Sequence, residues 1–147
     1  MLLTSRALIT TTLILISNIA LAELHVTQAK IRLLPPSVPN TSAYFEIENS
    51  GENDVTLVGG KADIANKVEL HNHIMSGDVM RMEKQSAVII PAGKTITFAP
   101  GGLHMMIFGL KQPLKKEQIV PLALMTKDGQ QIKFDAHVVS PNQHRHH

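Results

Sequence analysis

Short runs in which apolar and polar residues alternate, each closed by turn residues, dominate the chain from residue 23 onward. Alternation with a period of two is typical of a β-strand with one buried face, because successive side chains point to opposite faces. In "SAYFEIEN" (42–49), Phe45 and Ile47 face one way, and Tyr44 and Glu46 the other. The predicted strands are 23–34, 42–49, 55–62, 67–74, 79–84, two short strands within 86–102, 103–110, 119–127 and 131–139.

Turn signals between these runs indicate how neighbouring strands pair. "MSGD" (75–78) predicts a hairpin between two strands, and the Asp-Gly pair at 128–129 predicts another at the end of the chain. The pair Gly59-Gly60 predicts a bulge. One short turn of helix is expected near 63–67. Strands at this spacing, without a long helical pattern, predict an all-β sandwich.

The first 22 residues differ from the rest. "MLLTSRALITTTLILISNIALA" carries one charge, Arg6, then an uncharged and largely apolar run that ends in Ala-Leu-Ala. This order is typical of a cleaved secretory signal. A retained membrane anchor is the alternative, but the apolar run is short for a span and contains polar residues. We therefore expect a signal peptide at 1–22, a single domain at 23–139, a flexible His-rich tail at 140–147, and no membrane insertion after cleavage.

Composition excludes several classes of function. A net charge of +2 and an aromatic content of 3% give no support to nucleic-acid binding. The chain has no cysteine, so disulfides and thiolate ligands are excluded, and a blue-copper redox site would need a cysteine. No nucleotide-binding glycine motif, GxSxG or HExxH is present, so we do not expect an enzyme. Any metal must be held by His, Met, Asp or Glu.

The run "LHMMIF" (103–108) combines a histidine with two methionines. On a strand, His104 and Met106 share one face, whereas Met105 points to the other and is expected in the core. Same-face neighbours lie roughly 6–7 Å apart, so an imidazole and a flexible thioether at these positions can reach one ion. The same spacing recurs on the two strands of the first predicted hairpin, as His71-x-His73 and Met80-x-Met82.

Each of these residues also has a structural interpretation. A single methionine usually fills a gap in the core, and a lone histidine on a sheet is usually held by hydrogen bonds. The three paired motifs together, in an exported chain without cysteine, favour a metal site instead. Thioether sulfur is soft and suits Cu(I) far better than zinc or calcium. A His/Met site without thiolate is therefore expected to bind Cu(I).

The spacing of four of these residues resembles that of a known family, the periplasmic copper chaperones of the PCu(A)C type. The motif of that family is His, ten residues, Met, twenty-one residues, then His-x-Met. His71, Met82, His104 and Met106 match it at all four positions. The segments "GDVMRM" and "IPAGKTITFAPGGLHMMIFGLKQPL" are similar to the family as well. The resemblance covers nearly all of residues 23–139.

The resemblance implies a cupredoxin-like, Greek-key β-sandwich that holds one Cu(I) at those four residues. It implies a periplasmic, monomeric protein that delivers copper to the CuA centre of cytochrome c oxidase, often together with a Sco-type protein, or that serves copper homeostasis. His73 and Met80 could act as alternate or transient ligands, although neighbouring surface or core residues are the simpler interpretation. Met75 could shield the metal. The tail could also collect Cu(II), through His144, His146 and His147.

A competing hypothesis from another class is a metal-free, secreted β-sandwich used in adhesion or assembly. It treats every methionine as core and every histidine as surface. It expects that changing Met82 and Met106 alters stability and nothing else.

Overall fold

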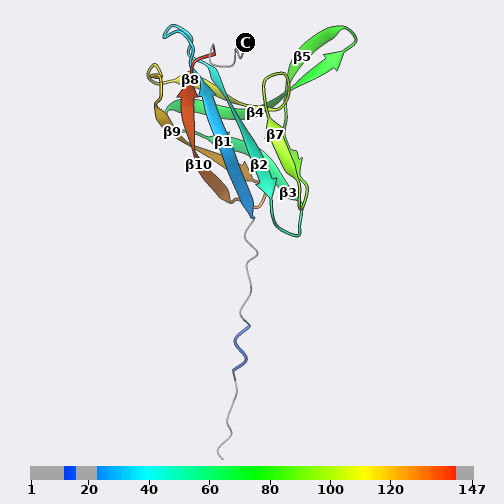
Figure 1. Cartoon of the computed structure of the whole chain (residues 1–147). Helices are drawn as coiled ribbons and strands as arrows, with labels where there is room; N and C mark the ends of the chain where they lie inside the picture. Colours follow the sequence, from blue (N-terminus) through cyan, green and yellow to red (C-terminus); the bar gives the residue numbers. More distant parts are fainter. Residues whose placement is uncertain (1–11, 16–22, 142–147) are drawn as a thin grey trace, which may run out of the picture.

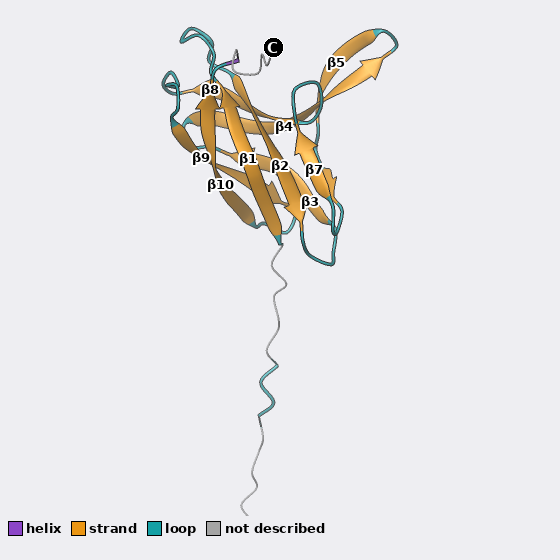
Figure 2. Ribbon diagram, in the orientation of Figure 1, coloured by secondary structure: helices purple, strands orange, loops and turns teal. Residues whose placement is uncertain are grey.

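The computed structural model describes residues 12–15 and 23–141. Ten β-strands form its regular structure (Figures 1 and 2). They are β1 (Leu24–Arg32), β2 (Thr41–Asn49), β3 (Val55–Lys61), β4 (Ala65–Ser76), β5 (Val79–Lys84), β6 (Val88–Ile90), β7 (Thr95–Phe98), β8 (His104–Leu110), β9 (Ile119–Thr126) and β10 (Gln131–Val139). The predicted signal segment and the tail histidines fall outside the described residues, apart from 12–15, so both stay predictions. Within the described part, no helix is long and apolar enough to span a membrane.

The strands pair in the order β5-β4-β8-β2-β1-β10-β9-β3-β6, and β7 also pairs with β2. All pairs are antiparallel except β1 with β10, and the non-consecutive neighbours are the crossovers of a Greek-key arrangement. Strands far apart in this order still pack together, β3 near β4 and β6 near β2. The sheet therefore folds over on itself and encloses a core, which confirms the predicted all-β sandwich.

The core is built from the alternating positions that the sequence predicts. In β2, Phe45 and Ile47 are buried, while Tyr44 and Glu46 on the opposite face are partly exposed. The Phe45 ring stacks on Phe98 with 4.4 Å between centroids, and lies 5.2 Å from the Phe134 ring. Removing such side chains from water is the main stabilising contribution in a domain without disulfides.

Local structure follows the turn signals with one exception. The predicted hairpins β4–β5 and β9–β10 form, and the ladder between β3 and β9 shifts register between Leu57 and Gly59, which is the predicted bulge. The helix expected near 63–67 is wrong, because residues 63–64 form a turn and β4 begins at Ala65 opposite Leu110. A single helical turn has an unfavourable nucleus, whereas pairing with β8 satisfies the same backbone groups.

Strand β4 has two different halves. From Ala65 to His71 it pairs with β8, and from His71 to Ser76 it pairs with β5. The outer half and β5 form an arm that extends away from the body of the sandwich (Figure 1). His71 lies at the junction, opposite His104 on one side and Lys84 on the other.

The glycine pair in β3 gives a test of this packing. A Cβ on Gly60 would lie 2.8 Å from Val68 Cγ1 and 2.9 Å from the Ala123 carbonyl oxygen, whereas a Cβ on Gly59 would meet nothing within 4 Å. We expect Gly60→Ala to lower the free energy of unfolding by about 1–3 kcal/mol through overpacking. Gly59→Ala should change it by less than about 0.5 kcal/mol. Urea denaturation of residues 23–141, which contain all ten strands, measures both. Equal effects would contradict this packing.

Candidate metal centre

Strands β4, β5 and β8 bring the predicted ligands into one region. His71 on β4 lies directly opposite His104 on β8, and His73 on β4 lies opposite Met82 on β5. Directly opposite residues of an antiparallel pair point to the same face, with Cβ atoms about 5 Å apart. Two ladders thus place side chains from three strands on a common face.

The closest contact in this region joins His104 and Met82. His104 Nε2 lies 3.1 Å from Met82 Sδ, and His104 Nδ1 lies 2.9 Å from the Gly102 carbonyl oxygen. A carbonyl can only accept, so Nδ1 carries the proton in that hydrogen bond. In the neutral ring Nε2 then presents a lone pair to a thioether sulfur. Two electron-pair donors facing each other at this distance are the arrangement that a bound cation would use.

His71 is oriented by a carboxylate on its own strand. Its Nε2 lies 2.8 Å from Glu69 Oε2, and Glu69 also pairs with Lys67 and Lys84 at 3.3 and 3.4 Å. Nε2–H therefore donates to the carboxylate. His71 Nδ1 is buried and has no hydrogen-bond partner, so it holds a free lone pair when the ring is neutral. A carboxylate that fixes one nitrogen of a histidine in this way is a common companion of metal ligation at the other.

His73 lies closer to the centre than the sequence suggested. Its ring stacks on the ring of His104, with 4.9 Å between centroids, and its Nδ1 is buried without a partner. Buried polar atoms are almost always hydrogen-bonded, so an unpartnered imidazole nitrogen in such a place needs a reason. The interpretation of His73 as a plain neighbouring residue does not supply one, whereas ligation of a soft cation does.

Met106 and Met105 divide as the alternation predicts. Met105 is fully buried in the core, opposite Leu70. Met106 lies on the same face of β8 as His104, and its Sδ accepts a hydrogen bond of 3.1 Å from Ser42 Oγ on β2. The direct contact in this structure is between His104 and Met82. Met106 is a candidate ligand because it lies next to His104 on the same face of β8, and Ser42 orients its sulfur.

Burial differs sharply across the centre. His104 is 2% exposed and Met82 is 48% exposed. Burial lowers the pKa of His104 below its ordinary value of 6.5, and nearby His73 and His71 lower it further, against the opposing effect of the Gly102 carbonyl. The ring is therefore neutral at neutral pH. The centre has a buried, neutral imidazole as its floor and a half-exposed thioether at its opening.

Three residues around the centre were not predicted. Glu69 orients His71, Ser42 orients Met106, and the Tyr44 ring lies 6.4 Å from the His104 ring. Glu69 could have been found, because residues i and i+2 share a face and the sequence reads Glu-x-His. The other two lie on β2, and no local pattern connects that strand to the centre.

The donor set limits the metal. Within the described ranges, no group of three or more His, Asp and Glu side chains is placed to hold an ion, so methionine sulfur has to complete any site here. The carboxylate of Glu69, which accepts a hydrogen bond from His71, is also paired with Lys67 and Lys84. Neutral imidazoles with thioethers fit Cu(I) and not zinc, calcium or magnesium.

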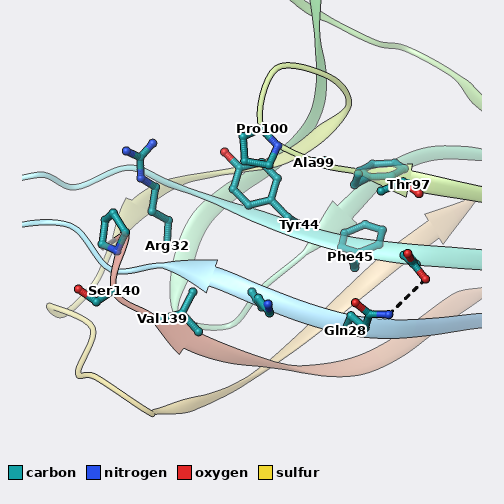
Figure 3. A pocket seen from close by; sticks show the side chains of 13 residues that line it. Gln28, Arg32, Tyr44, Phe45, Thr97, Ala99, Pro100, Val139 and Ser140 are labelled. Atoms are coloured by element: carbon teal, nitrogen blue, oxygen red, sulfur yellow. Dashed lines mark hydrogen bonds between the residues drawn. The ribbon is translucent and has the colours of Figure 1, made fainter. Parts of the chain in front are cut away.

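A cavity of about 350 Å³ lies beside this region, between β1, β2 and the loop after β7 (Figure 3). Lys30, Arg32, Tyr44 and Pro100 are among the residues that line it, and none of the predicted ligands does. Tyr44 is shared, since it lines the cavity and also approaches the His104 ring. The cavity is therefore separate from the candidate metal centre, and Tyr44 adjoins both.

The pairing of Glu69 predicts a pH dependence of stability. The hydrogen bond from His71, together with Lys67 and Lys84 and against the effect of burial, lowers the pKa of Glu69 from 4.5 to about 2. A lowered folded-state pKa stabilises the fold above pH 4.5, and this contribution is lost as pH falls from 4.5 to about 2. We expect Glu69→Gln to be less stable than the parent at pH 7, with a difference that shrinks through this window.

Unfolding by urea at pH 7, 5, 3 and 2 measures this difference. Glu83→Gln is the matched control, because the half-exposed Glu83 has only Arg81 at 3.9 Å and its replacement should change little at any pH. A Glu69→Gln deficit that is constant from pH 7 to 2 would show that the ionised carboxylate is not its source.

Solved structures share this fold. The copper-bound PCuAC domain from PmoF2 superposes with a TM-score of 0.69 at 19% identity, over 83% of this chain and 97% of that domain. The solution structure of CuI-DR1885 from Deinococcus radiodurans has a TM-score of 0.64 at 32% identity, over 78% of this chain and 76% of that one. PCuAC domains are cupredoxin-like β-sandwiches, so this part of the fold prediction is confirmed as well.

Sequence comparison gives a relative and a family. The "Putative lipoprotein Lxx21020" of Leifsonia xyli subsp. xyli is 36% identical over 90 residues, which are 60% of this chain and 54% of that protein. The match thus spans about half the length of this curated relative. Residues 24–138, which include all ten strands but for the last residue of β10, match the family described as "Putative lipoprotein LpqE-like". The chain therefore belongs to the LpqE-like family, and its fold is that of a PCuAC domain.

Proposed function

We propose that this protein is an exported copper chaperone that holds one Cu(I) at His71, Met82, His104 and Met106 and passes it to another protein. The observation that carries the proposal is the contact between His104 and Met82. A buried imidazole nitrogen with a free lone pair faces a thioether sulfur at 3.1 Å. The unpartnered Nδ1 atom of His71 lies on the same face, with its ring centroid 5.9 Å from that of His104.

The oxidation state follows from the donors. Thioether sulfur prefers the soft, monovalent ion, and two imidazoles add no charge. The relative from Deinococcus radiodurans, 32% identical to this chain, was solved as CuI-DR1885. Methionine is a suitable ligand outside the cytoplasm, because it cannot be lost to disulfide formation there, although oxidation to the sulfoxide would inactivate it. The lipoprotein names of the family and of the relative support export, and we propose the periplasm as the compartment.

Transfer is proposed to occur by ligand exchange. Met82 belongs to β5, all of whose residues are exposed, so an incoming ligand can replace its sulfur first while His104 still holds the ion. Neutral thioethers are weaker donors than thiolates, so a cysteine-bearing acceptor takes copper downhill. We propose the CuA subunit of cytochrome c oxidase or a Sco-type protein as that acceptor. No bond of the protein itself is made or broken, and the role is not enzymatic.

The competing adhesion hypothesis is not favoured. It places every methionine in the core, but Met82 is half-exposed and Met75 and Met80 are more exposed still. It places histidines on the surface, whereas His104 is among the fully buried residues. The hypothesis has no account of the unpartnered nitrogens of His71 and His73.

An anaerobic Cu(I) titration against a colorimetric chelator tests the site. We expect residues 23–141 to bind Cu(I) tightly at this centre, because the four proposed ligands are two thioethers and two imidazoles. In the Met82→Leu, Met106→Leu double variant the affinity of this centre for Cu(I) should fall by at least about 100-fold. Both soft sulfur ligands are lost, and the remaining imidazole nitrogens are ligands of only intermediate softness.

Met105→Leu is the matched control for this titration. It changes a methionine adjacent in sequence to Met106 but buried in the core, so it should leave the affinity for Cu(I) unchanged. Equal and weak binding by the parent chain and the double variant would reject the proposed function. A loss in Met105→Leu as large as in the double variant would mean that folding and not ligation controls the binding.

The histidines predict how affinity changes with pH. Thioethers do not titrate, so protons compete with copper only at imidazole, and the ordinary imidazole pKa is about 6.5. At His104 this competition begins lower, because burial reduces its pKa. We expect the Cu(I) affinity to be constant from pH 8 to about 7 and to fall below about 6.5. Titrations at several pH values measure this, and an affinity that stays flat down to pH 4 would argue against histidine ligation.

A further inference from the structure

The tip of the β4–β5 arm exposes apolar side chains without an evident structural use. Met75 is 58% exposed and Met80 is 55% exposed, and Val79 beside them is also exposed. The arm extends from the sandwich, so these residues do not contribute to the core (Figure 1). Clustered apolar residues on an exposed arm usually mark a site of binding. The four-residue centre does not account for Met75 or Met80.

The register of the arm aligns these methionines with the centre. Met75 lies directly opposite Met80, and one step inward along the same face His73 lies opposite Met82. Opposite residues share a face with Cβ atoms about 5 Å apart, and each step of two residues advances about 7 Å. The next step inward reaches His71, which lies opposite His104. One face of the arm therefore carries His or Met at almost every position from the exposed tip to the buried imidazole.

His73 connects the two ends of this row. Its ring stacks on His104, it lies opposite Met82, and it is two residues from Met75 on the same face. Its Nδ1 is buried without a hydrogen-bond partner. The four-residue centre does not use this nitrogen, so it is available as the third donor beside the two sulfurs at the tip.

We propose that Met75, Met80 and His73 form a second, weaker Cu(I) site, through which copper enters and leaves the buried centre. This inference rests on the proposed function and adds a site to it. Two thioethers and one imidazole are again a soft, neutral set that selects Cu(I). The site is weaker because a two-stranded arm without a packed face is only marginally ordered, so binding must also immobilise two methionine side chains.

Movement along the row is a series of ligand exchanges. Cu(I) held by His73 can exchange its bonds to the Met75 and Met80 sulfurs for a bond to the Met82 sulfur, and then its bond to His73 for one to His104. Thioethers and neutral imidazoles add no charge, so the charge of each loaded site is that of the metal. An acceptor would then only need to reach the tip of the arm, and the buried His104 would not have to be exposed.

A silver titration followed by NMR tests this second site. Ag(I) is the probe, because it is soft, monovalent and diamagnetic like Cu(I) and is not oxidised by air. Residues 23–141, with ¹³C-labelled methionine methyl groups, exclude the tail histidines. We expect the first equivalent to shift the methyl signals of Met82 and Met106. The second equivalent should shift those of Met75 and Met80.

A Met75→Leu, Met80→Leu double variant completes the test. Both positions are exposed, so the variant keeps its fold and its apolar surface and loses only sulfur. The second equivalent should bind at least about 10-fold more weakly, while the affinity for the first stays the same. Val79→Leu, at the same tip but without sulfur, should keep both equivalents.

The outcomes separate the two proposals. Tip methyl signals that stay unshifted at two equivalents, or a double variant that retains the second ion, would overturn the second site while the shift of Met82 still supports the centre. Failure of the first equivalent to shift Met82 and Met106 in the parent chain would reject the proposed function itself, and the second site with it.

Discussion

The candidate metal centre depends on the pairing of β4 with β8. It sets His71 opposite His104, and on the other face of the same ladder it sets Leu70 opposite Met105 in the core. A slip of one residue would exchange these faces, because side chains alternate along a strand. Burial of Leu70 and Met105 therefore holds the candidate ligands His71 and His104 in register. The Leu70–Met105 pair thus helps to fix the register of the two strands that carry His71 and His104.

Hydrogen bonds then decide which nitrogens are free. One imidazole is tied to a backbone carbonyl at Gly102, and the other is tied to the carboxylate of Glu69. In the neutral form of each ring the bonded nitrogen carries the proton, so the other nitrogen has a free lone pair. Lys67 and Lys84 hold Glu69 in its ionised form, which makes it a pure acceptor. Glu69, Lys67 and Lys84 thus orient His71 without belonging to the proposed set of ligands.

The strands, and the face on which each candidate ligand lies, could be predicted from the sequence. The reason is that the alternation of apolar and polar residues can be read from a short stretch of the chain. It reached the β4–β5 hairpin for the same reason, through the turn at 75–78. It did not place His73, since periodicity gives the face of a residue but not the ring that stacks on it. The helix near 63–67 was wrong because pairing with a distant strand outweighed a weak local preference. Ser42 was missed because β2 is far away in the chain, and its contact with Met106 exists only in the folded sheet.

The four proposed ligands carry no negative charge, and this affects how easily a copper carrier of this kind would release the ion. The carboxylate of Glu69 is neutralised by its partners, and Lys84 lies opposite His71, so nothing at the centre compensates the charge of a bound ion. A thiolate acceptor does compensate it, and attracts a monovalent cation more strongly in surroundings of low dielectric constant. Because Met82 is half-exposed and His104 is buried, such an acceptor would approach the proposed ion from the side of Met82. The proposed centre would therefore hold copper with neutral donors only and would be the weaker partner in an exchange with a thiolate, which is the property that the proposed delivery requires.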